Sequence, residues 1–300
     1  MDQGTERTRQ GRRKATAIGA IAVLLWASLA ALTGSLGEIP PFQLLAMAFA
    51  IAFAAGCLWL LATGGPSRFR LLAQPPLFWL LATFGLYAYH ALYFLALRLA
   101  LAAEANLINY LWPLLIVLFS ALLPGAEGLR PRQLLGASMG LLGTGLLIAS
   151  GGGLGGAGAS LRGYAAALAC ALVWSSYSVL NRRFSAVPSE AMIGICGAVA
   201  LLGLLTHLTI EPPGFRPSAA EALAIAAMGI GPLGLAFLAW DHGTKHGDLP
   251  VLGTLAYAAP ILSTLLLVVL GRAAPSLALA AACALVAGGG WIAARSAPVR

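Results

Sequence analysis

Four stripes of aromatic and polar side chains are the residues of this sequence that could bind a small molecule. Their members step mostly by three or four positions, which places each stripe on one face of a helix. Aromatic rings stack and attract cations to their faces, while amides bind polar groups without a fixed charge. This combination suits a zwitterion such as an amino acid. The stripes are Tyr89, His90 and Tyr93; Asn106, Asn109, Tyr110 and Pro113; Trp174, Tyr177, Ser178 and Asn181; and Thr254, Tyr257, Ile261 and Thr264.

The composition indicates whether these stripes lie in a soluble or a membrane protein. The chain has 300 residues, of which 60% are hydrophobic and only 9% are charged. Soluble domains have about 45–50% apolar and about 25% charged residues, so a soluble domain, a disordered chain and a disulfide scaffold are excluded. Nearly continuous apolar runs at 114–123 and 261–270 also exclude a β-barrel, whose strands would alternate. We therefore expect an all-α polytopic membrane protein.

Ten stretches are long enough to cross a bilayer, which takes about 20 mostly apolar residues. They are 15–36, 42–63, 77–97, 105–123, 133–150, 163–180, 190–209, 220–240, 249–270 and 275–294. Rings near span ends are expected to form an interfacial belt, to which we assign Trp59, Trp79, Tyr164, Trp240 and Trp291. The stripes lie nearer the span centres, where a ring with a polar atom must face protein or a cavity. One such residue could merely tie helices together, but four stripes favour a cavity wall.

The basic residues predict the orientation of the spans. With the N-terminus in the cytoplasm, 14 Lys and Arg residues fall inside and 4 fall outside. The positive-inside rule therefore predicts that both termini are cytoplasmic. The same pattern accounts for the net charge of +8 without nucleic-acid binding, because the charges flank the spans.

Ionisable side chains are expected to be almost absent from the centres of the spans. His90 is the exception, and a carboxylate at mid-membrane, the usual proton relay of coupled transporters, is missing. We therefore predict weak or no proton coupling through carboxylates, with transport down the substrate gradient or through His90. Asp241, Lys245 and Asp248 follow the eighth span and are interpreted as solvated loop charges. A gate at the inner mouth is the alternative.

The second half of the chain repeats the first at an offset of about half its length. Residues 23–28 match 171–176 at an offset of 148, and residues 109–115 match 256–262 at an offset of 147. Because each repeat has five spans, the second repeat must insert upside-down relative to the first. Inverted repeats are typical of secondary transporters, whose substrate site lies near mid-membrane between the repeats.

Ten spans in two repeats, with a Tyr-x-x-Pro in each fourth span and a Trp-x-Ser in each first, resemble the drug/metabolite transporter superfamily of EamA-type transporters. Residues 104–113, 87–93 and 174–180 are similar to its branch of bacterial aromatic amino acid exporters. The resemblance implies a basket-like fold lined mainly by spans 1, 3, 4, 6, 8 and 9, and export across the inner membrane by alternating access. Ala259 stands where the first repeat has Trp112, which predicts an asymmetric cavity.

The expected organisation is a basic cytoplasmic tail (1–14), a first five-helix repeat (15–150), a Gly-rich periplasmic linker (151–162), a second repeat (163–295) and a cytoplasmic tail (296–300). Pro113 and Pro260 remove the helix bonds to the carbonyls of Asn109 and Ala256, and act either as simple kinks or as hinges that present polar backbone. The central substrate cavity is predicted to be lined by Trp26, Tyr89, His90, Tyr93, Asn109, Tyr110, Trp112, Trp174, Tyr177 and Tyr257.

The sequence thus predicts a transporter of amino acids, preferentially Phe, Trp and Tyr, and not an enzyme. Membrane lipid is an expected partner, nucleic acid is not, and the chain is expected to act as a monomer without cofactor or metal. The four cysteines lack metal-ligand spacing and are interpreted as packing residues. One alternative is export of another metabolite or drug by the same fold. The other is an intramembrane hydrolase that pairs Ser28 or Ser175 with His90.

Overall fold

The computed structural model describes residues 3–33, 36, 39–100, 102–123, 128, 130–150, 161–212, 215–271 and 275–294. This part of the chain contains helices and no strands, which confirms the prediction of an all-α protein. Most of the predicted linker at 151–162, and the whole of the predicted tail at 296–300, lie outside the described residues.

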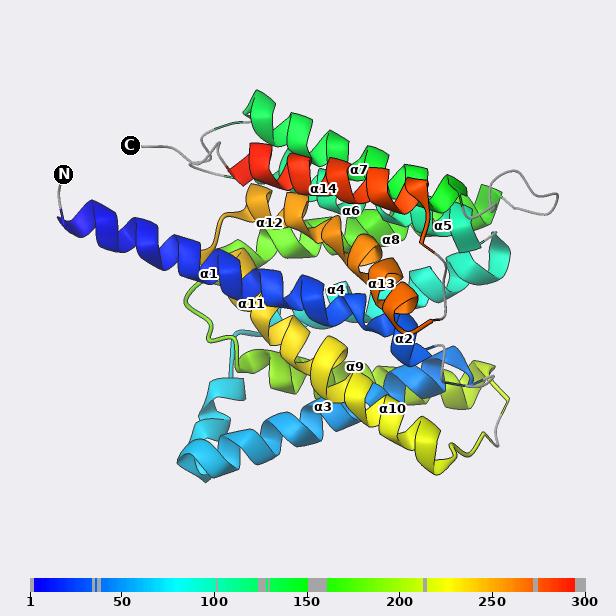
Figure 1. Ribbon diagram of the computed structural model, residues 1–300. Helices are drawn as coiled ribbons and strands as arrows, with labels where there is room; N and C mark the ends of the chain where they lie inside the picture. The colour runs from blue at the N-terminus through cyan, green and yellow to red at the C-terminus, as the bar shows by residue number, and fades with distance from the viewer. Residues whose placement is uncertain are drawn as a thin grey trace.

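The helices before residue 151 are α1 (Gln3–Ala27), α2 (Leu29–Thr33), α3 (Pro41–Gly64), η1 (Pro66–Leu72), α4 (Pro76–Leu99), α5 (Ala102–Asn109), α6 (Trp112–Ser120) and α7 (Pro131–Ser150). The helices after residue 160 are α8 (Leu161–Leu180), η2 (Asn181–Phe184), α9 (Ala191–Ile210), α10 (Ala219–Ile230), η3 (Gly231–Leu235), α11 (Ala236–His246), α12 (Leu249–Ala256), α13 (Ala258–Val269) and α14 (Leu277–Ala294) (Figure 1).

Seven helical segments of the described chain are long and apolar enough to cross a membrane, which makes this a multi-pass membrane protein. The segments are Thr8–Thr33, Pro41–Gly64, Pro76–Leu99, Leu161–Phe184, Ala191–Ile210, Ala219–His246 and Leu249–Val269. A shorter apolar helix covers Leu277–Ala293. The predicted fourth span is divided into α5 and α6, each too short to cross a bilayer alone. The count of ten crossings stays a prediction.

The predicted eighth span differs from its sequence boundary at the C-terminal side. We expected it to end at residue 240, but α10, η3 and α11 form one segment from Ala219 to His246. Gly231–Leu235 forms a π-helical turn, a local widening that often marks functional sites. The longer segment carries Asp241 and Lys245 into the helix bundle.

Each main helix contact joins one helix from the first half of the chain to one from the second. α1 packs against α11, α3 against α9, α4 against α8, α6 against α12, and α7 against α14 (Figure 1). The predicted repeat would relate α1 to α8 and α4 to α11. Under that relation the α1–α11 contact corresponds to the α4–α8 contact, and each of the other pairs corresponds to itself. The start of α1 and the end of α14 lie at the same end of the bundle (Figure 1).

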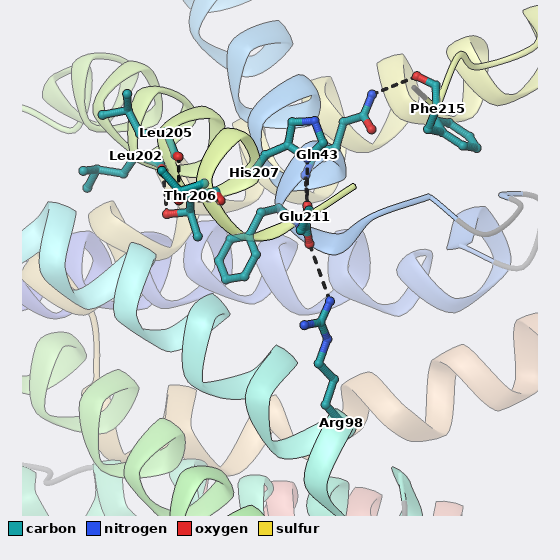
Figure 2. Close-up of polar contacts among 10 residues, drawn as sticks. Gln43, Arg98, Leu202, Leu205, Thr206, His207, Glu211 and Phe215 are labelled. Carbon is teal, nitrogen blue, oxygen red and sulfur yellow. Dashed lines mark hydrogen bonds and ion pairs between the residues drawn. The ribbon is translucent and has the colours of Figure 1, made fainter. Parts of the chain in front are cut away.

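The α3–α9 pair is tied at both of its ends. At one end, the buried carboxylate of Glu211 accepts hydrogen bonds from the backbone N–H groups of Phe42 and Gln43 at 3.0–3.1 Å, which caps the first turn of α3. His207 Nδ1 lies 3.0 Å, and the Arg98 guanidinium 3.9 Å, from this carboxylate (Figure 2). Ion pairing of Arg68 with Glu190 at 3.2 Å ties the other end. These contacts hold α3 and α9 together at both ends of the pair.

Helices α1 and α11 approach so closely that only glycine fits between them. A Cβ added at Gly243 would lie 2.5 Å from the Cα of Gly19, a backbone atom that cannot move independently. We expect Gly243→Ala to lower the free energy of unfolding by about 1–3 kcal/mol through overpacking. Thermal unfolding of the purified protein measures this. Gly11→Ala, also in α1, is the control, because no heavy atom lies within 4 Å of its added Cβ. Equal unfolding midpoints for both variants would contradict the close contact.

Candidate functional site

Five large rings from four helices form the aromatic cluster, which has Trp174 of α8 near its centre. The Trp174 ring centroid lies 5.9 Å from Trp26 of α1 and 6.3 Å from Trp112 of α6. It lies 5.7 Å from Phe237 and 6.2 Å from Trp240, both of α11. Such pairs contribute about 0.5–1.5 kcal/mol each beyond the burial of area. The cluster therefore holds together helices from both halves of the chain.

Two indole N–H groups of the cluster, those of Trp26 and Trp240, have partners within the protein. Trp26 Nε1 donates to the carbonyl of Pro232 in η3 at 3.0 Å, and Trp240 Nε1 donates to Ser178 Oγ at 3.1 Å. Trp26 also lies 5.2 Å from Trp240 between ring centroids. These hydrogen bonds satisfy polar atoms that would otherwise be buried without partners, and they hold the rings in fixed orientations.

The predicted stripe of α4 extends the cluster. Tyr89 lies 5.2 Å from Trp174, and Tyr93 stacks parallel to Tyr89 with centroids 6.2 Å apart. His90 lies 6.2 Å from Phe237, edge to face. The α4 stripe thus continues the aromatic surface from the centre of the bundle along one helix.

Two asparagines of α5 meet this stripe. Tyr93 Oη donates to Asn106 Oδ1 at 2.6 Å, and Asn109 Nδ2 donates to Tyr89 Oη at 3.3 Å. Asn109 is only 4% exposed, and its Oδ1 makes no hydrogen bond to any described residue. A buried acceptor beside aromatic faces is suited to a substrate ammonium, because the rings also attract cations.

Both predicted proline positions follow breaks in a helix. α5 ends at Asn109 and α6 begins at Trp112, while α12 and α13 are separated at Tyr257. The N–H of Leu114, in the first turn of α6, donates to the Tyr257 hydroxyl at 3.2 Å. First-turn N–H groups have no partner within their own helix. A side chain at the break in one half therefore satisfies the backbone at the break in the other.

Ring contacts and side-chain hydrogen bonds join eight of the ten predicted site residues, but no such contact among the described residues joins Tyr110 or Tyr257 to them. Tyr177 joins the group, since its ring lies 5.4 Å from Trp174 and its hydroxyl contacts Met192 Sδ at 3.6 Å. Tyr257 is buried in a separate apolar group with α7 and α14. No ring contact joins Tyr110 to the aromatic cluster in the described part of the chain. The eight are Trp26, Tyr89, His90, Tyr93, Asn109, Trp112, Trp174 and Tyr177.

Three rings of the site were absent from the sequence prediction. Assignment of Trp240 to an interfacial belt was wrong, because it is 1% exposed and packs in the cluster. Phe237, three residues earlier, and Phe49 of α3 also contact site rings. The signal for two of them was present: Phe237, Trp240, Asp241 and Thr244 step by three, one and three along one helix face.

Interpretation of the three charges after residue 240 as solvated was also wrong. Asp241, Lys245 and Asp248 are 0%, 3% and 6% exposed. Lys245 Nζ lies 2.9 Å from Asp241 Oδ2, and Asp248 pairs with Arg12 and caps α12 through the N–H of Val251. The last turns of the eighth span therefore contain charged residues, which protein groups surround and pair.

A cavity of about 530 Å³ lies between α7 and the end of α5 with the following Leu111, and contains none of the predicted site residues. In this conformation the rings of the aromatic cluster pack directly on one another. A substrate that binds among them must therefore separate them. The cavity is lined by Ile108, Leu111, Leu141, Leu142, Gly145, Leu146 and Ala149.

The serines of the hydrolase alternative are engaged elsewhere. Ser28 Oγ donates to the carbonyl of Leu25, and Ser175 Oγ donates to that of Ala171, each at 2.7 Å. Neither contact involves His90, so the described residues offer no geometry that favours a Ser–His pair. Within the same residues, no group of three His, Cys, Asp or Glu side chains could hold a metal ion.

Comparison with known proteins identifies the family. The chain is 53% identical to the aromatic amino acid exporter YddG of Ancylobacter novellus, over 94% of this chain and 97% of that protein. The YddG exporter of Escherichia coli K12 is 29% identical over 95% of this chain and 99% of its own. A solved crystal structure with 53% identity superposes with a TM-score of 0.89 and covers 94% of this chain and 96% of its own. The model of the EamA-like transporter family matches residues 13–149 and again residues 161–295, and the chain therefore belongs to this family of transporters.

Proposed function

We propose that this protein exports aromatic amino acids across the inner membrane of a bacterium. The proposal rests on the aromatic cluster, which joins both halves of a transporter whose relatives at 53% and 29% identity are named aromatic amino acid exporters. Rings of Trp and Tyr offer stacking faces to the side chains of Phe, Trp and Tyr. This preference would distinguish the site from that of an exporter of general metabolites.

The site can bind the backbone of an amino acid without a central fixed charge. Asn109 Oδ1 is a buried acceptor without a hydrogen bond to the described residues, and it lies on the helix whose Asn106 contacts Tyr93. We assign the substrate ammonium to this oxygen and to the faces of Tyr89 and Tyr93. Cation–π attraction contributes about 0.5–2 kcal/mol per ring at such sites.

Alternating access would exchange the contacts of two helix pairs. The α1–α11 and α4–α8 pairs correspond to each other when the two halves are exchanged, and the aromatic cluster lies between them. Two equivalent pairs can close one end of the bundle while opening the other at similar energy. Two matches of one family model support the repeat, and the odd number of predicted spans in each supports its inversion.

Both termini are assigned to the cytoplasm. The count of 14 basic residues inside against 4 outside supports this orientation. The start of α1 lies at the same end of the bundle as η1 and η2, which carry Arg68, Arg70, Arg182 and Arg183 (Figure 1). We accordingly call this end of the bundle its cytoplasmic end.

Transport by the purified protein in liposomes tests the proposed function. We expect uptake or exchange of radiolabelled Trp, Phe and Tyr to exceed that of Ala, Lys and Glu by about tenfold or more, since two ring contacts are worth about 1–3 kcal/mol. Liposomes without protein give the background. Uptake of other metabolites with indifference to the three aromatic amino acids would contradict the substrate and favour the alternative exporter, while leaving the family unchanged.

A further inference from the structure

A group of polar side chains is buried at the cytoplasmic end of the eighth span, outside the aromatic cluster. We call Asn181, Asp241, Thr244 and Lys245 the inner polar cluster; the first three are 0% exposed and Lys245 is 3% exposed. Asn181 Nδ2 donates to Asp241 Oδ1 at 2.8 Å and lies 3.2 Å from Thr244 Oγ1. Lys245 Nζ lies 2.9 Å from Asp241 Oδ2. A cation and an anion are thus enclosed together in a chain with few charges.

These contacts cross the interface between the two helix pairs that alternating access would separate. Asp241 and Lys245 belong to α11, which packs on α1, whereas Asn181 extends α8, which packs on α4. Lys245 also donates to the carbonyl of Val187 at 3.0 Å and lies 4.9 Å from the ring of Phe78, at the start of α4. Parting the α11 and α8 sides at this end would remove the Asn181, Val187 and Phe78 contacts. The ion pair within α11 would then face the cytoplasm.

Burial of this ion pair is poorly explained by stability alone. Taking two charges out of water costs several kcal/mol per ion, and well-packed apolar side chains of similar volume often serve as well. Ionisable residues within membrane spans are rare for this reason and usually mark a substrate or ion pathway. The pair therefore points to a role in transport.

One acceptor of the inner polar cluster, Asn181 Oδ1, makes no hydrogen bond in the described structure. Asp241 Oδ2 is paired with Lys245 Nζ at 2.9 Å. Buried acceptors without hydrogen bonds are uncommon in native proteins and call for an explanation such as a ligand. A substrate ammonium has three donors and suits Asn181 Oδ1 and the carboxylate of Asp241, while the three donors of Lys245 suit a substrate carboxylate.

We infer that Asp241 and Lys245 form the entry site for the zwitterionic backbone of the amino acid, exposed when the cytoplasmic end opens. Asp241 binds the substrate ammonium and Lys245 binds its carboxylate. When the cytoplasmic end is closed, the two side chains are buried and neutralise each other. When this end opens, the same two charges can bind the substrate. This inference rests on the proposed function of amino acid export.

The decisive variant removes both charges together, because this avoids an unpaired buried charge. We expect D241N/K245M to raise the KM for L-Trp, measured in inside-out membrane vesicles, by about tenfold, as loss of charge-assisted hydrogen bonds predicts. KM measured from the opposite face should stay within about twofold. The matched control is R68Q/E190Q, which removes another ion pair of the chain outside the inner polar cluster. It should leave both values unchanged.

Competition by two analogues separates recognition from a purely structural role. Tryptamine lacks the carboxylate and indole-3-propionate lacks the ammonium, so both should compete with L-Trp at the cytoplasmic face of the wild type far more weakly than L-Trp itself. In D241N/K245M this preference for the zwitterion should fall by about tenfold. If Asp241 and Lys245 had only a structural role, D241N/K245M would change the amount of folded protein or the maximal rate. The preference for the zwitterion over the two analogues would then equal that of the wild type.

The outcomes distinguish this inference from the proposed function. A wild type that transports no aromatic amino acid overturns both. A wild type that transports L-Trp, together with a folded D241N/K245M variant whose cytoplasmic KM and analogue preference match it, overturns the entry site alone. If the double variant does not fold, K245R keeps the charge and changes the donor geometry. An unchanged preference and KM in K245R would then count against the site.

Discussion

Lys245→Met alone is expected to lower the free energy of unfolding by about 3–5 kcal/mol, because it leaves the carboxylate of Asp241 buried without its cation. Asp241 is fully buried and lies 2.9 Å from Lys245 Nζ, and the hydrogen bond from Asn181 cannot replace a positive charge. Thermal unfolding of the purified protein in detergent, followed by circular dichroism, measures the change. The effect should be among the largest of any substitution outside the aromatic cluster.

Restoring neutrality should recover most of the lost stability. In D241N/K245M both charges are gone, the amide introduced at position 241 can still accept a hydrogen bond from Asn181, and the unfolding midpoint is expected to return close to that of the wild type. The single and double variants form a cycle whose coupling energy reports the buried pair directly. Additive effects, with the double variant less stable than either single one, would show that the pair is not enclosed as the structure has it.

The same two residues mark the limit of what the sequence predicts. Hydropathy locates the core of a span but not its last turn, so the eighth span was predicted to end before Asp241. Charges at the end of an apolar run are normally solvated, and one helix considered alone offers no reason for another environment. Lys245 is enclosed by tertiary contacts with Phe78 of α4 and with the carbonyl of Val187. Contacts of that kind are tertiary and cannot be obtained from helical periodicity.

The environment of the aromatic residues in mid-span was predictable for a physical reason. A Tyr or Trp in mid-span must face protein, because lipid offers its polar atom no partner. That argument placed Trp26, Trp112 and Trp174 together correctly, since each contacts the other two. The same argument could not tell that Tyr257 lies outside the aromatic cluster. Tyr257 also faces protein, but in another apolar group, and its hydroxyl accepts a hydrogen bond from the Leu114 N–H. That these mid-span rings would face protein was predictable, but the neighbour against which each one packs was not.

Trp174→Ala is expected to lower kcat/KM for aromatic amino acids by about tenfold to a hundredfold. This ring contacts more members of the site than its neighbours in α8 do, including Trp26, Trp112, Phe237 and Trp240. A substrate ring that binds among them would lose the stacking face of Trp174, worth about 0.5–1.5 kcal/mol, together with the area buried against that ring. Uptake of radiolabelled Trp and Phe into proteoliposomes measures the loss.

Removing so large a buried ring also opens a cavity, at about 3–5 kcal/mol for Trp→Ala, so folding must be separated from recognition. Trp174→Phe keeps an aromatic face and should retain transport within about tenfold of the wild type, whereas Trp174→Leu fills space without one and should resemble Trp174→Ala. Trp291→Ala is the control for the loss of a Trp, because its side chain is 57% exposed and outside the cluster. If Trp174→Leu transported aromatic amino acids as well as Trp174→Phe did, the aromatic cluster would be a packing core, and the substrate would have to bind elsewhere.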